Sequence, residues 1–236
     1  MQPQDIEQGS DAWLAIRCGK ATASRVADIV ARTKSGYGAS RSNYLAELVS
    51  ERLTGNSAER FQNDAMRWGT EKEPDARAAY EFYTDETVEL VGFVQHPKIT
   101  DTGASPDGLV GERGLVEIKC PNTATHIETL LGGAVPSKYI TQMQWQMACT
   151  DRAWCDFVSF DPRLPESMSL FVKRVERDAD MVAMLEKEVA GFLREVDETV
   201  AQLRAKYEPD GRPANVRAAA ERYCPGLGEA IVTTGE

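Results

Sequence analysis

The sequence is poor in the residues that build several common kinds of protein site. Its only histidines are His96 and His126, and none of its five cysteines lies in a C-x-x-C pair. A histidine-based metal or nucleophile site, a structural zinc site and a disulfide framework are therefore not indicated. No apolar run approaches the length that crosses a bilayer, and the first residues show no signal-peptide pattern. We expect a cytoplasmic protein with reduced cysteines and no membrane contact.

Positive charge is also in short supply. Lysine and arginine total 27 against 37 aspartates and glutamates, which gives a formal net charge of −10. This balance argues against a simple nucleic-acid-binding protein, which is usually basic. Local charge rather than net charge decides contact with phosphate, so DNA binding would require a basic channel within an acidic exterior. The excess of carboxylates also suits a site that holds metal ions.

The chain of 236 residues is long enough for one large domain with a hydrophobic core. It has no internal repeats and no linker rich in proline, glycine or serine, so we expect a single domain over residues 1–206. The segment 207–236 contains several prolines and glycines. It is expected to form a loosely packed C-terminal tail.

Periodicity and capping residues predict the elements of this domain. Helices are expected where apolar residues recur at helical spacing, at residues 11–17, from Ser24 onward, 44–53, 65–83, 124–131, 137–150 and 178–206. Pro74 predicts a break near residues 71–73. Strands are expected where β-branched and apolar residues cluster, at residues 87–95, 107–110, 115–119, 154–160 and 168–175. This order predicts an α/β (α+β) fold with a central mixed sheet flanked by helices and a helical N-terminal third.

The densest group of chemically useful residues lies on a predicted hairpin. Asp107 begins one strand, and Glu117 and Lys119 lie on the next, beyond the turn at residues 111–114. Alternate residues of a strand face the same side, so Glu117 and Lys119 are co-facial, and the hairpin returns Asp107 toward them. Carboxylates are ligands for Mg²⁺, which activates water and offsets charge on a phosphate. A neighbouring lysine can orient the attacking water or stabilise the developing charge. The group therefore predicts phosphodiester hydrolysis.

Each half of this pattern also has a purely structural explanation. Pro-Asp-Gly at residues 106–108 is a common turn sequence, and Glu-x-Lys is common on exposed strand faces. The strand–turn–strand context favours the functional interpretation, and the chain offers no competing catalytic cluster.

The spacing of Asp107, Glu117 and Lys119 resembles the D-x(n)-E-x-K pattern of the PD-(D/E)XK nuclease superfamily, whose members have a restriction-endonuclease-like core. Further strings, in the same order, are similar to the bacteriophage lambda exonuclease family, also called YqaJ-like viral recombinases. They are GSDAW at 9–13, RCG at 17–19, TAS at 22–24, WG at 68–69, EPDAR at 73–77, SPDGL at 105–109, EIKCP at 117–121, LGG at 131–133, QMQ at 142–144 and DPR at 161–163. The resemblance does not clearly cover the C-terminal tail.

The resemblance implies an enzyme that degrades one strand of double-stranded DNA from its 5′ end to mononucleotides and leaves a 3′ overhang. It implies that Asp107 and Glu117 bind Mg²⁺, with Mn²⁺ as an alternative and two ions per active site. The backbone carbonyl of Ile118 and the carboxylate of Glu73 are implied as further ligands. Without the resemblance, Glu73 would be interpreted as a solvated charge on a helix.

The resemblance also assigns roles around the reacting phosphate. Lys119 is implied as the catalytic residue that positions the nucleophilic water, and Gln142 as a residue of the helix behind the active site. Arg17 and Ser24 match residues that bind the 5′-terminal phosphate. Independently of the family, a helix start at Ser24 offers free N–H groups, Arg17 is a bidentate phosphate donor, and Ser105 can add a hydroxyl. If these residues do not bind phosphate, Ser24 is only a helix cap and Arg17 is only a surface charge.

One position departs from the family pattern. Thr125 stands where the phosphate pocket of the family member considered carries an arginine. The pocket is therefore expected to be less positive, with a weaker preference for 5′-phosphorylated ends unless Lys20 or His126 supplies the missing charge.

Related enzymes form a ring of three subunits and work beside a single-strand annealing protein. The resemblance thus implies a homotrimer that acts on double-stranded DNA ends, preferably 5′-phosphorylated, in the cytoplasm of a bacterial or phage-infected cell. Two alternatives stay open: an endonuclease of the same superfamily, and a DNA-binding subunit without catalysis. Blocking both ends of a linear duplex separates an exonuclease from an endonuclease.

Overall fold

The structure is a computed structural model that describes residues 6–34, 36–57 and 64–208. The chain forms two compact units, Met1–Val196 and Asp197–Glu236. The second unit is described only as far as Glu208 and consists there of the end of a helix. Residues 209–236 of the expected tail lie outside the described residues, and so does Cys224. The elements below belong to the first unit unless stated otherwise.

The first helices begin and end largely where capping residues predict. Helix α1 (Asp11–Arg17) starts at Ser10, whose side chain accepts a hydrogen bond from the backbone N–H of Trp13 at 3.2 Å. Helix α3 (Ala39–Thr54) ends at Gly55, which takes the left-handed conformation that closes a helix. The helix expected at residues 11–17 is confirmed, whereas the helix expected at 44–53 begins earlier, at Ala39, and ends at Thr54.

The second helix differs from its prediction at the start. Helix α2 (Ala23–Val30) buries Val26 and Ile29 as expected, but its N-cap is Thr22, with no side-chain capping bond. Ser24 is therefore an exposed residue of the first turn and not the cap. The physical reason is that Thr22 belongs to a strand whose end also starts the helix.

The predicted break ahead of Pro74 is wrong. Helix α4 runs without interruption from Asp64 to Thr84 with Pro74 inside it. A proline removes one backbone hydrogen bond, but the following turns anchor the helix. Ala76 and Tyr80 are fully buried, and the Tyr80 hydroxyl donates to Asp156 Oδ2 at 2.9 Å. This packing outweighs the local cost of the proline.

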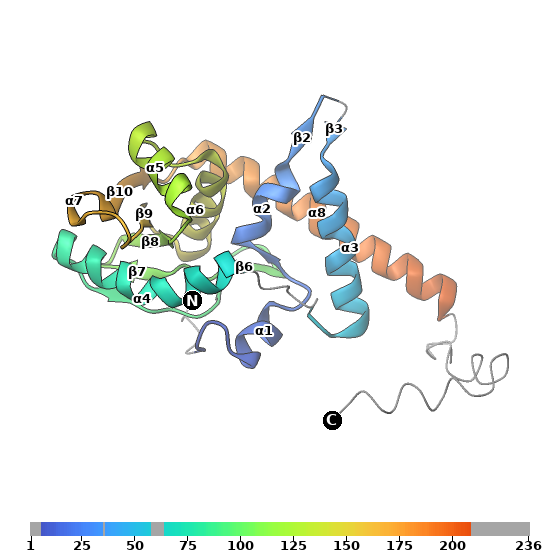
Figure 1. Cartoon of the computed structure of the whole chain (residues 1–236). Coiled ribbons are helices and arrows are strands. Elements are labelled where there is room, and N and C mark those ends of the chain that lie inside the picture. The colour runs from blue at the N-terminus through green and yellow to red at the C-terminus, as the bar shows by residue number, and fades with distance from the viewer. Residues whose placement is uncertain (1–5, 35, 58–63, 209–236) are drawn as a thin grey trace. The chain divides into compact units, whose positions relative to one another are not determined.

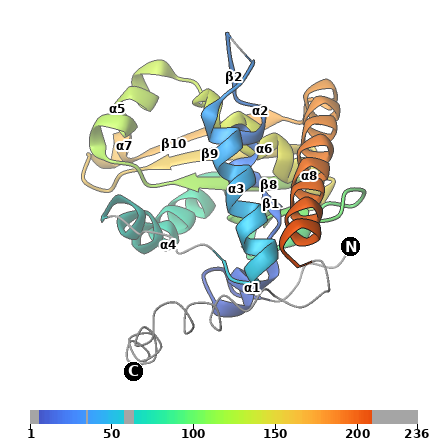
Figure 2. The same ribbon diagram turned by 90° about the vertical axis from the view of Figure 1, so that its right-hand side faces the viewer.

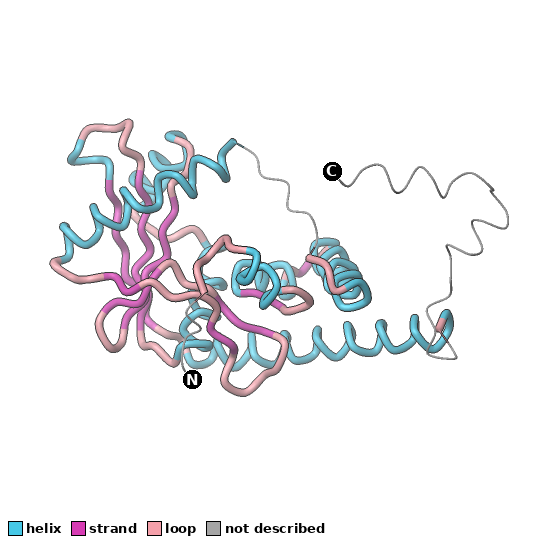
Figure 3. The backbone as a smooth tube through the Cα atoms, turned by 90° about the horizontal axis from the view of Figure 1, so that it is seen from below, coloured by secondary structure: helices cyan, strands magenta, loops and turns pink. Residues whose placement is uncertain are grey.

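The larger sheet has five strands in the order β10-β9-β8-β7-β4. Figure 3 shows strands of the structure side by side in magenta, with helices in cyan around them. Strands β8 and β9 are parallel, and the other neighbours are antiparallel. The predicted mixed sheet is confirmed. The strands are β4 (Val88–Glu89), β7 (Gly108–Val110), β8 (Gly114–Lys119), β9 (Trp154–Phe160) and β10 (Leu170–Glu176).

The predicted hairpin is strands β7 and β8, in which Gly108 lies opposite Val116. A side chain at Gly108 would overlap Val88 of the neighbouring strand β4. Gly108 is therefore required for close strand packing, and Pro-Asp-Gly leads into a strand instead of forming an isolated turn. This arrangement fixes the backbone next to Asp107.

The single strand predicted at residues 87–95 is wrong, because the segment divides between two sheets. Its first part is β4, and its second part, β5 (Val94–Gln95), joins a three-stranded sheet in the order β1-β6-β5. Val91 and Phe93 are buried where the chain crosses between the sheets. The other strands of the small sheet are β1 (Ala21–Thr22) and β6 (Thr102–Ala104), and a separate hairpin is formed by β2 (Arg32–Thr33) and β3 (Gly36–Tyr37).

Helices cover both faces of the larger sheet, with α4 on one side and α6 (Ser137–Thr150) on the other (Figure 2). Alternate residues of β8 divide between the two layers. Val116 and Ile118 pack in the cluster with α4, whereas Leu115 packs in the cluster with α6. Figure 1 shows the remaining helices. They are α5 (Thr123–Gly132), α7 (Glu166–Ser169) and α8 (Ala179–Tyr207), and α8 extends into the second unit.

Within the described residues, no helix is long and apolar enough to cross a membrane. Cys18, Cys120, Cys149 and Cys155 are free thiols, and the last three are buried. The prediction of reduced, mostly buried cysteines is confirmed for these four.

Candidate active site

Glu117 and Lys119 lie on the face of β8 that is covered by α6. The Glu117 side chain is 0% exposed, and its Oε1 accepts a hydrogen bond from the Lys119 ammonium. Gln142 Nε2 donates to the same oxygen at 2.6 Å. Gln146 Nε2 donates to the other oxygen, Oε2, at 2.5 Å. The predicted co-facial placement is confirmed, and helix α6 holds the carboxylate in a fixed orientation.

Asp107 approaches this group from the start of β7. Its Oδ2 accepts a hydrogen bond from the backbone N–H of Ile118 at 2.6 Å. Burial and the nearby charge of Glu117 raise the pKa of Asp107 well above its ordinary value, and Lys119 only partly offsets them. A strand residue directs its N–H and C=O toward the same neighbour, so the Ile118 carbonyl also faces the edge occupied by Asp107. The structure thus brings both carboxylates and the lysine together.

Glu73 reaches the same region from α4. Its carboxylate accepts a hydrogen bond from Arg77 at 2.7 Å, one helical turn away. After burial and Glu117, the charge of Glu73 also raises the pKa of Asp107. Glu73 is therefore close enough to act on Asp107 electrostatically, while its own partner is Arg77.

The environment of Lys119 keeps its amine protonated. Burial opposes the charge, but the carboxylates of Glu117 and Asp107 outweigh this and raise the pKa of Lys119 above its ordinary value. The side chain is 28% exposed, so the ammonium lies at the opening of the buried cluster. The ring of Tyr139 lies beside it, with its centroid 5.5 Å from Nζ.

Sequence reasoning missed Tyr139 and Gln146. Together with Gln142 they occupy positions i, i+3 and i+7 of α6 and therefore share one helical face. The spacing of these residues is visible in the sequence, but it indicates a function only when it is known that this face of α6 packs on Glu117 and Lys119 of β8. Tyr139 also stacks on Phe157 at a centroid distance of 5.4 Å, which fixes its ring beside Lys119.

The donor set fits a hard divalent cation. No three histidine, cysteine or acidic side chains form a ready metal cage among residues 6–34, 36–57 and 64–208. Mg²⁺ is usually held by one or two carboxylates, with water and substrate phosphate completing its shell. Asp107 and Glu117 supply two carboxylates whose repulsion raises the pKa of Asp107, and a cation between them would relieve that repulsion.

Arg17 and Ser105 meet beside this cluster. Arg17 is 8% exposed, stacks on Trp13 at 3.7 Å, and directs Nη1 to Ser105 Oγ at 3.4 Å. Trp13 Nε1 donates to the same hydroxyl at 2.9 Å. Because Ser105 is two residues before Asp107, the predicted phosphate-binding residues Arg17 and Ser105 adjoin the carboxylate cluster.

Ser24 follows the neighbouring strand of the small sheet. In the parallel pair β1 and β6, Thr22 lies opposite Gly103. Because the two strands run in the same direction, Ser24, two residues after Thr22, and Ser105, two residues after Gly103, lie at the same end of this sheet. The hydroxyl oxygens of Ser24 and Thr22 lie 3.5 Å apart. Ser24 is thus placed on the same edge of the small sheet as Ser105.

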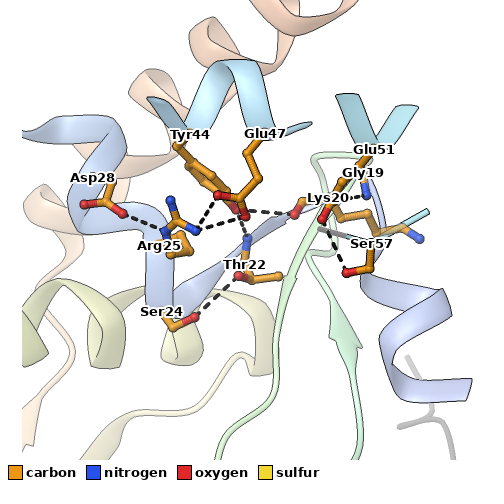
Figure 4. A network of polar contacts seen from close by, with 10 residues as sticks. All are labelled: Gly19, Lys20, Thr22, Ser24, Arg25, Asp28, Tyr44, Glu47, Glu51 and Ser57. Atoms are coloured by element: carbon orange, nitrogen blue, oxygen red, sulfur yellow. Dashed lines mark hydrogen bonds and ion pairs between the residues drawn. The ribbon is translucent and has the colours of Figure 1, made fainter. Parts of the chain in front are cut away.

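Helix α3 fixes the backbone between Arg17 and Ser24, as Figure 4 shows. The buried carboxylate of Glu51 accepts a hydrogen bond from Gly19 N at 2.7 Å, and the Tyr44 hydroxyl accepts one from Thr22 N at 3.0 Å. Gly19 has a φ of 71°, a conformation that favours glycine. The segment between Arg17 and Ser24, two of the predicted phosphate ligands, is therefore held in place by hydrogen bonds to α3.

Of the two candidate replacements for the missing arginine, His126 is not placed as proposed. His126 is fully buried, and its ring nitrogens contact Ser159 Oγ at 2.7 Å and the Met168 carbonyl at 2.9 Å. His126 therefore links α5 to β9 and α7, and its assignment as a phosphate donor is wrong. Lys20 directs its ammonium to the carbonyl of Ile16 at 2.6 Å, at the end of α1.

Fold and site together define a nuclease. The family model of the YqaJ-like viral recombinase domain matches residues 12–153. The chain belongs to this family, as the resemblance in its sequence predicted.

Solved structures agree with this membership. The alkaline exonuclease LHK-Exo from Laribacter hongkongensis is 54% identical to this chain, with a TM-score of 0.79 over 84% of this chain and 97% of that chain. A structure of LHK-Exo in complex with dAMP gives the same values. A phage-related exonuclease from Haemophilus somnus is 16% identical, with a TM-score of 0.62 over 78% of this chain and 96% of that chain, and this likeness concerns the fold alone. None of the curated proteins compared with the chain matches it.

Proposed function

We propose that this nuclease is a Mg²⁺-dependent exonuclease that degrades one strand of linear double-stranded DNA from its 5′ end to mononucleotides. The observation that carries the proposal is the convergence of Asp107, Glu117 and Lys119 at one end of the hairpin. The binding of dAMP, a mononucleotide, by a relative that is 54% identical supports the release of single nucleotides. The 3′ overhang that remains would serve recombination by single-strand annealing.

The residues divide the chemistry between them. Asp107 and Glu117 would hold the divalent ion, Mg²⁺ or Mn²⁺, with the Ile118 carbonyl and Glu73 as further ligands and a second ion in the same active site. When bound, the ion supplies Lewis-acid chemistry for phosphodiester hydrolysis. Lys119 orients the attacking water and stabilises the charge that develops on the phosphate.

The cluster around Arg17 suits recognition of the terminal phosphate. Its guanidinium is held by Trp13 and directed toward Ser105, and a pre-oriented arginine is an effective phosphate donor. Ser24 adds a hydroxyl and the N-terminus of α2 at the same edge of the small sheet. A 5′-phosphate bound there would place the first phosphodiester bond near Asp107.

We also propose a ring of three subunits that encloses the duplex and a single-strand annealing protein as partner. A basic channel inside an acidic exterior would reconcile DNA binding with the net charge of −10. The particle mass from light scattering tests the ring, because a monomer or dimer in solution contradicts it.

The direct test is digestion of a linear duplex labelled at one 5′ end, with Mg²⁺ or with EDTA. We expect early release of the labelled mononucleotide in Mg²⁺ only, and no cleavage of a duplex whose two ends are blocked by hairpin caps. Internal cleavage of the capped duplex would favour the endonuclease. An intact uncapped duplex in Mg²⁺ would favour a DNA-binding subunit without catalysis.

Arg17→Ala is expected to lower the preference for phosphorylated over hydroxyl 5′ ends by about tenfold or more. A hydrogen bond to a charged group contributes about 1.5–3 kcal/mol, and about 1.4 kcal/mol corresponds to a factor of ten. The measurement is the ratio of digestion rates on the two kinds of end. Arg32→Ala, which removes an exposed arginine paired with Glu188, is the matched control. An unchanged ratio in the Arg17 variant contradicts the assignment.

A further inference from the structure

We propose that Gln146 is a positioning residue that fixes the one oxygen of Glu117 with capacity left for a metal ion. This inference rests on the proposed metal-dependent function and deepens it. Gln146 is 0% exposed and donates to Glu117 Oε2 at 2.5 Å. It does not belong to the D-x(n)-E-x-K pattern, and it lies one helical turn beyond Gln142 on α6.

The count of hydrogen bonds at Glu117 identifies that oxygen. An ionised carboxylate offers about four acceptor positions, two on each oxygen. On Oε1, both are taken, by the Lys119 ammonium and by Gln142 Nε2. On Oε2, Gln146 Nε2 takes one, and no second donor to this oxygen is found in the part of the chain that the structure describes. A cation that approaches Glu117 therefore meets Oε2, and the bond from Gln146 sets the direction of its free lone pair.

The other end of the Gln146 amide is anchored as well. Its Oε1 accepts a weak hydrogen bond from the Cys155 thiol, with sulfur and oxygen 4.0 Å apart. Cys155 lies on β9, is fully buried, and keeps its proton because burial raises its pKa well above the ordinary value. A thiol donor at Oε1 keeps Nε2 toward Glu117, because the reversed amide would place an oxygen against the carboxylate. The Gln146 amide therefore bridges Cys155 on β9 and Glu117, and only one orientation of the amide makes both hydrogen bonds.

This geometry gives Gln146 a different task from Gln142. Gln142 shares its oxygen with Lys119 and so acts beside the catalytic ammonium. Among the described residues, Gln146 is the one donor to Oε2, the oxygen that would meet the ion. Groups that orient a metal ligand from behind commonly change metal affinity by about 10- to 100-fold when removed, and we expect an effect in this range.

The test is Mn²⁺ binding by full-length protein, measured from the free-ion signal in electron paramagnetic resonance. Gln146→Met keeps the size of the side chain and removes the amide. Gln144→Met is the matched control, because Gln144 lies on the same helix and is 2% exposed. Its amide instead bonds the Glu176 carbonyl at 2.8 Å and Asp178 N at 2.9 Å. We expect the Mn²⁺ dissociation constant to rise at least about tenfold in the Gln146 variant and to stay within about twofold of the parent in the control.

Each result decides between the inference and the function on which it rests. Equal Mn²⁺ affinity in the parent and in Gln146→Met overturns the positioning role and leaves the nuclease proposal intact. If the parent binds no Mn²⁺, or if Glu117→Gln binds it as tightly as the parent, the metal site itself fails and the inference fails with it. Should Gln146→Met not fold by circular dichroism, Cys155→Ala replaces it, because this change frees the amide without touching Glu117. A rise of about two- to fivefold in its dissociation constant, the value of one weak hydrogen bond, supports the inference where it exceeds the change in the Gln144→Met control, and no rise beyond that control overturns it.

Discussion

Lys119→Met is expected to reduce DNA hydrolysis by about 10³-fold or more while leaving duplex binding near that of the parent. Within residues 6–34, 36–57 and 64–208, the ammonium is the one positive group paired with Glu117, and the carboxylates around it keep it protonated. Loss of a single group that stabilises the charge of a transition state costs about 10²–10³ in rate. Lys119 also orients the water, so the loss should reach the upper end. Methionine fills the space, so the fold and the DNA-binding surface persist.

Single-turnover hydrolysis and duplex binding in Ca²⁺ measure the two halves of this prediction. Lys138→Met is the matched control, because Lys138 is exposed and its ammonium lies 4.7 Å from the Tyr139 ring without an ion pair to Glu117. The control should retain most of the activity. If the hydrolysis rate of Lys119→Met stayed within tenfold of the parent rate, Lys119 would have no catalytic role. If Lys119→Met lost duplex binding to the same extent as hydrolysis, the lysine would contribute to DNA affinity and not to the reaction step.

The elements that the sequence predicted well are those whose signals are local. Helix α6 and strand β9 have the expected bounds, Ser137–Thr150 and Trp154–Phe160. The N-cap of α1 at Ser10 and the end of α3 at Gly55 depend on bonds within a few residues. Such signals are visible in the sequence because both partners lie in the same short segment.

The errors arose where partners are distant in the chain. Pro74 lies inside α4 because Tyr80 bonds Asp156 on β9, 76 residues later. The segment 87–95 divides because β4 pairs with β7 and β5 pairs with β6. Helix propensity and strand propensity describe the segment alone, whereas these outcomes depend on which surface the segment meets.

The same distinction applies to the active site. Asp107, Glu117 and Lys119 were predictable because one hairpin brings them together. Gln146 and the burial of His126 were not, because each depends on a helix meeting a strand far along the chain. The site is therefore a local triad supported by long-range contacts, and only the triad is visible in the sequence.

Holding two carboxylates together without a cation opposes folding. Burial and Glu117 raise the pKa of Asp107, which means that the folded protein binds this proton more tightly than the unfolded chain does. A group with a raised folded-state pKa contributes stability that is fully present below its unfolded pKa, about 3.9 for aspartate. This contribution is lost as the pH rises through the folded-state pKa. In EDTA, the contribution of Asp107 should therefore make the protein less stable as the pH rises from about 4 toward neutrality.

Asp107→Asn is expected to abolish this part of the pH dependence and to stop the reaction. The amide oxygen can still accept the bond from Ile118 N, while the repulsion with Glu117 disappears. In EDTA at neutral pH, the free energy of unfolding should rise by about 1 kcal/mol, the usual size of a single-site effect. Hydrolysis in Mg²⁺ should fall by more than about 100-fold, because removal of a group that only orients a metal ligand already costs about 10- to 100-fold and Asp107 is proposed as a ligand itself.

Urea unfolding from pH 4 to 8 in EDTA, beside hydrolysis rates in Mg²⁺, checks both parts of the prediction. Asp75→Asn is the control, because Asp75 is an exposed residue of α4 paired with Lys72, and its neutralisation should change neither quantity substantially. An Asp107 variant that is less stable than the parent at neutral pH would mean that the carboxylate stabilises the metal-free fold. Retained hydrolysis would mean that the ion is held elsewhere. The expected pair of results, higher stability with lost activity, follows only if the ionised Asp107 side chain is unfavourable beside Glu117 in the metal-free fold and is needed to bind the ion.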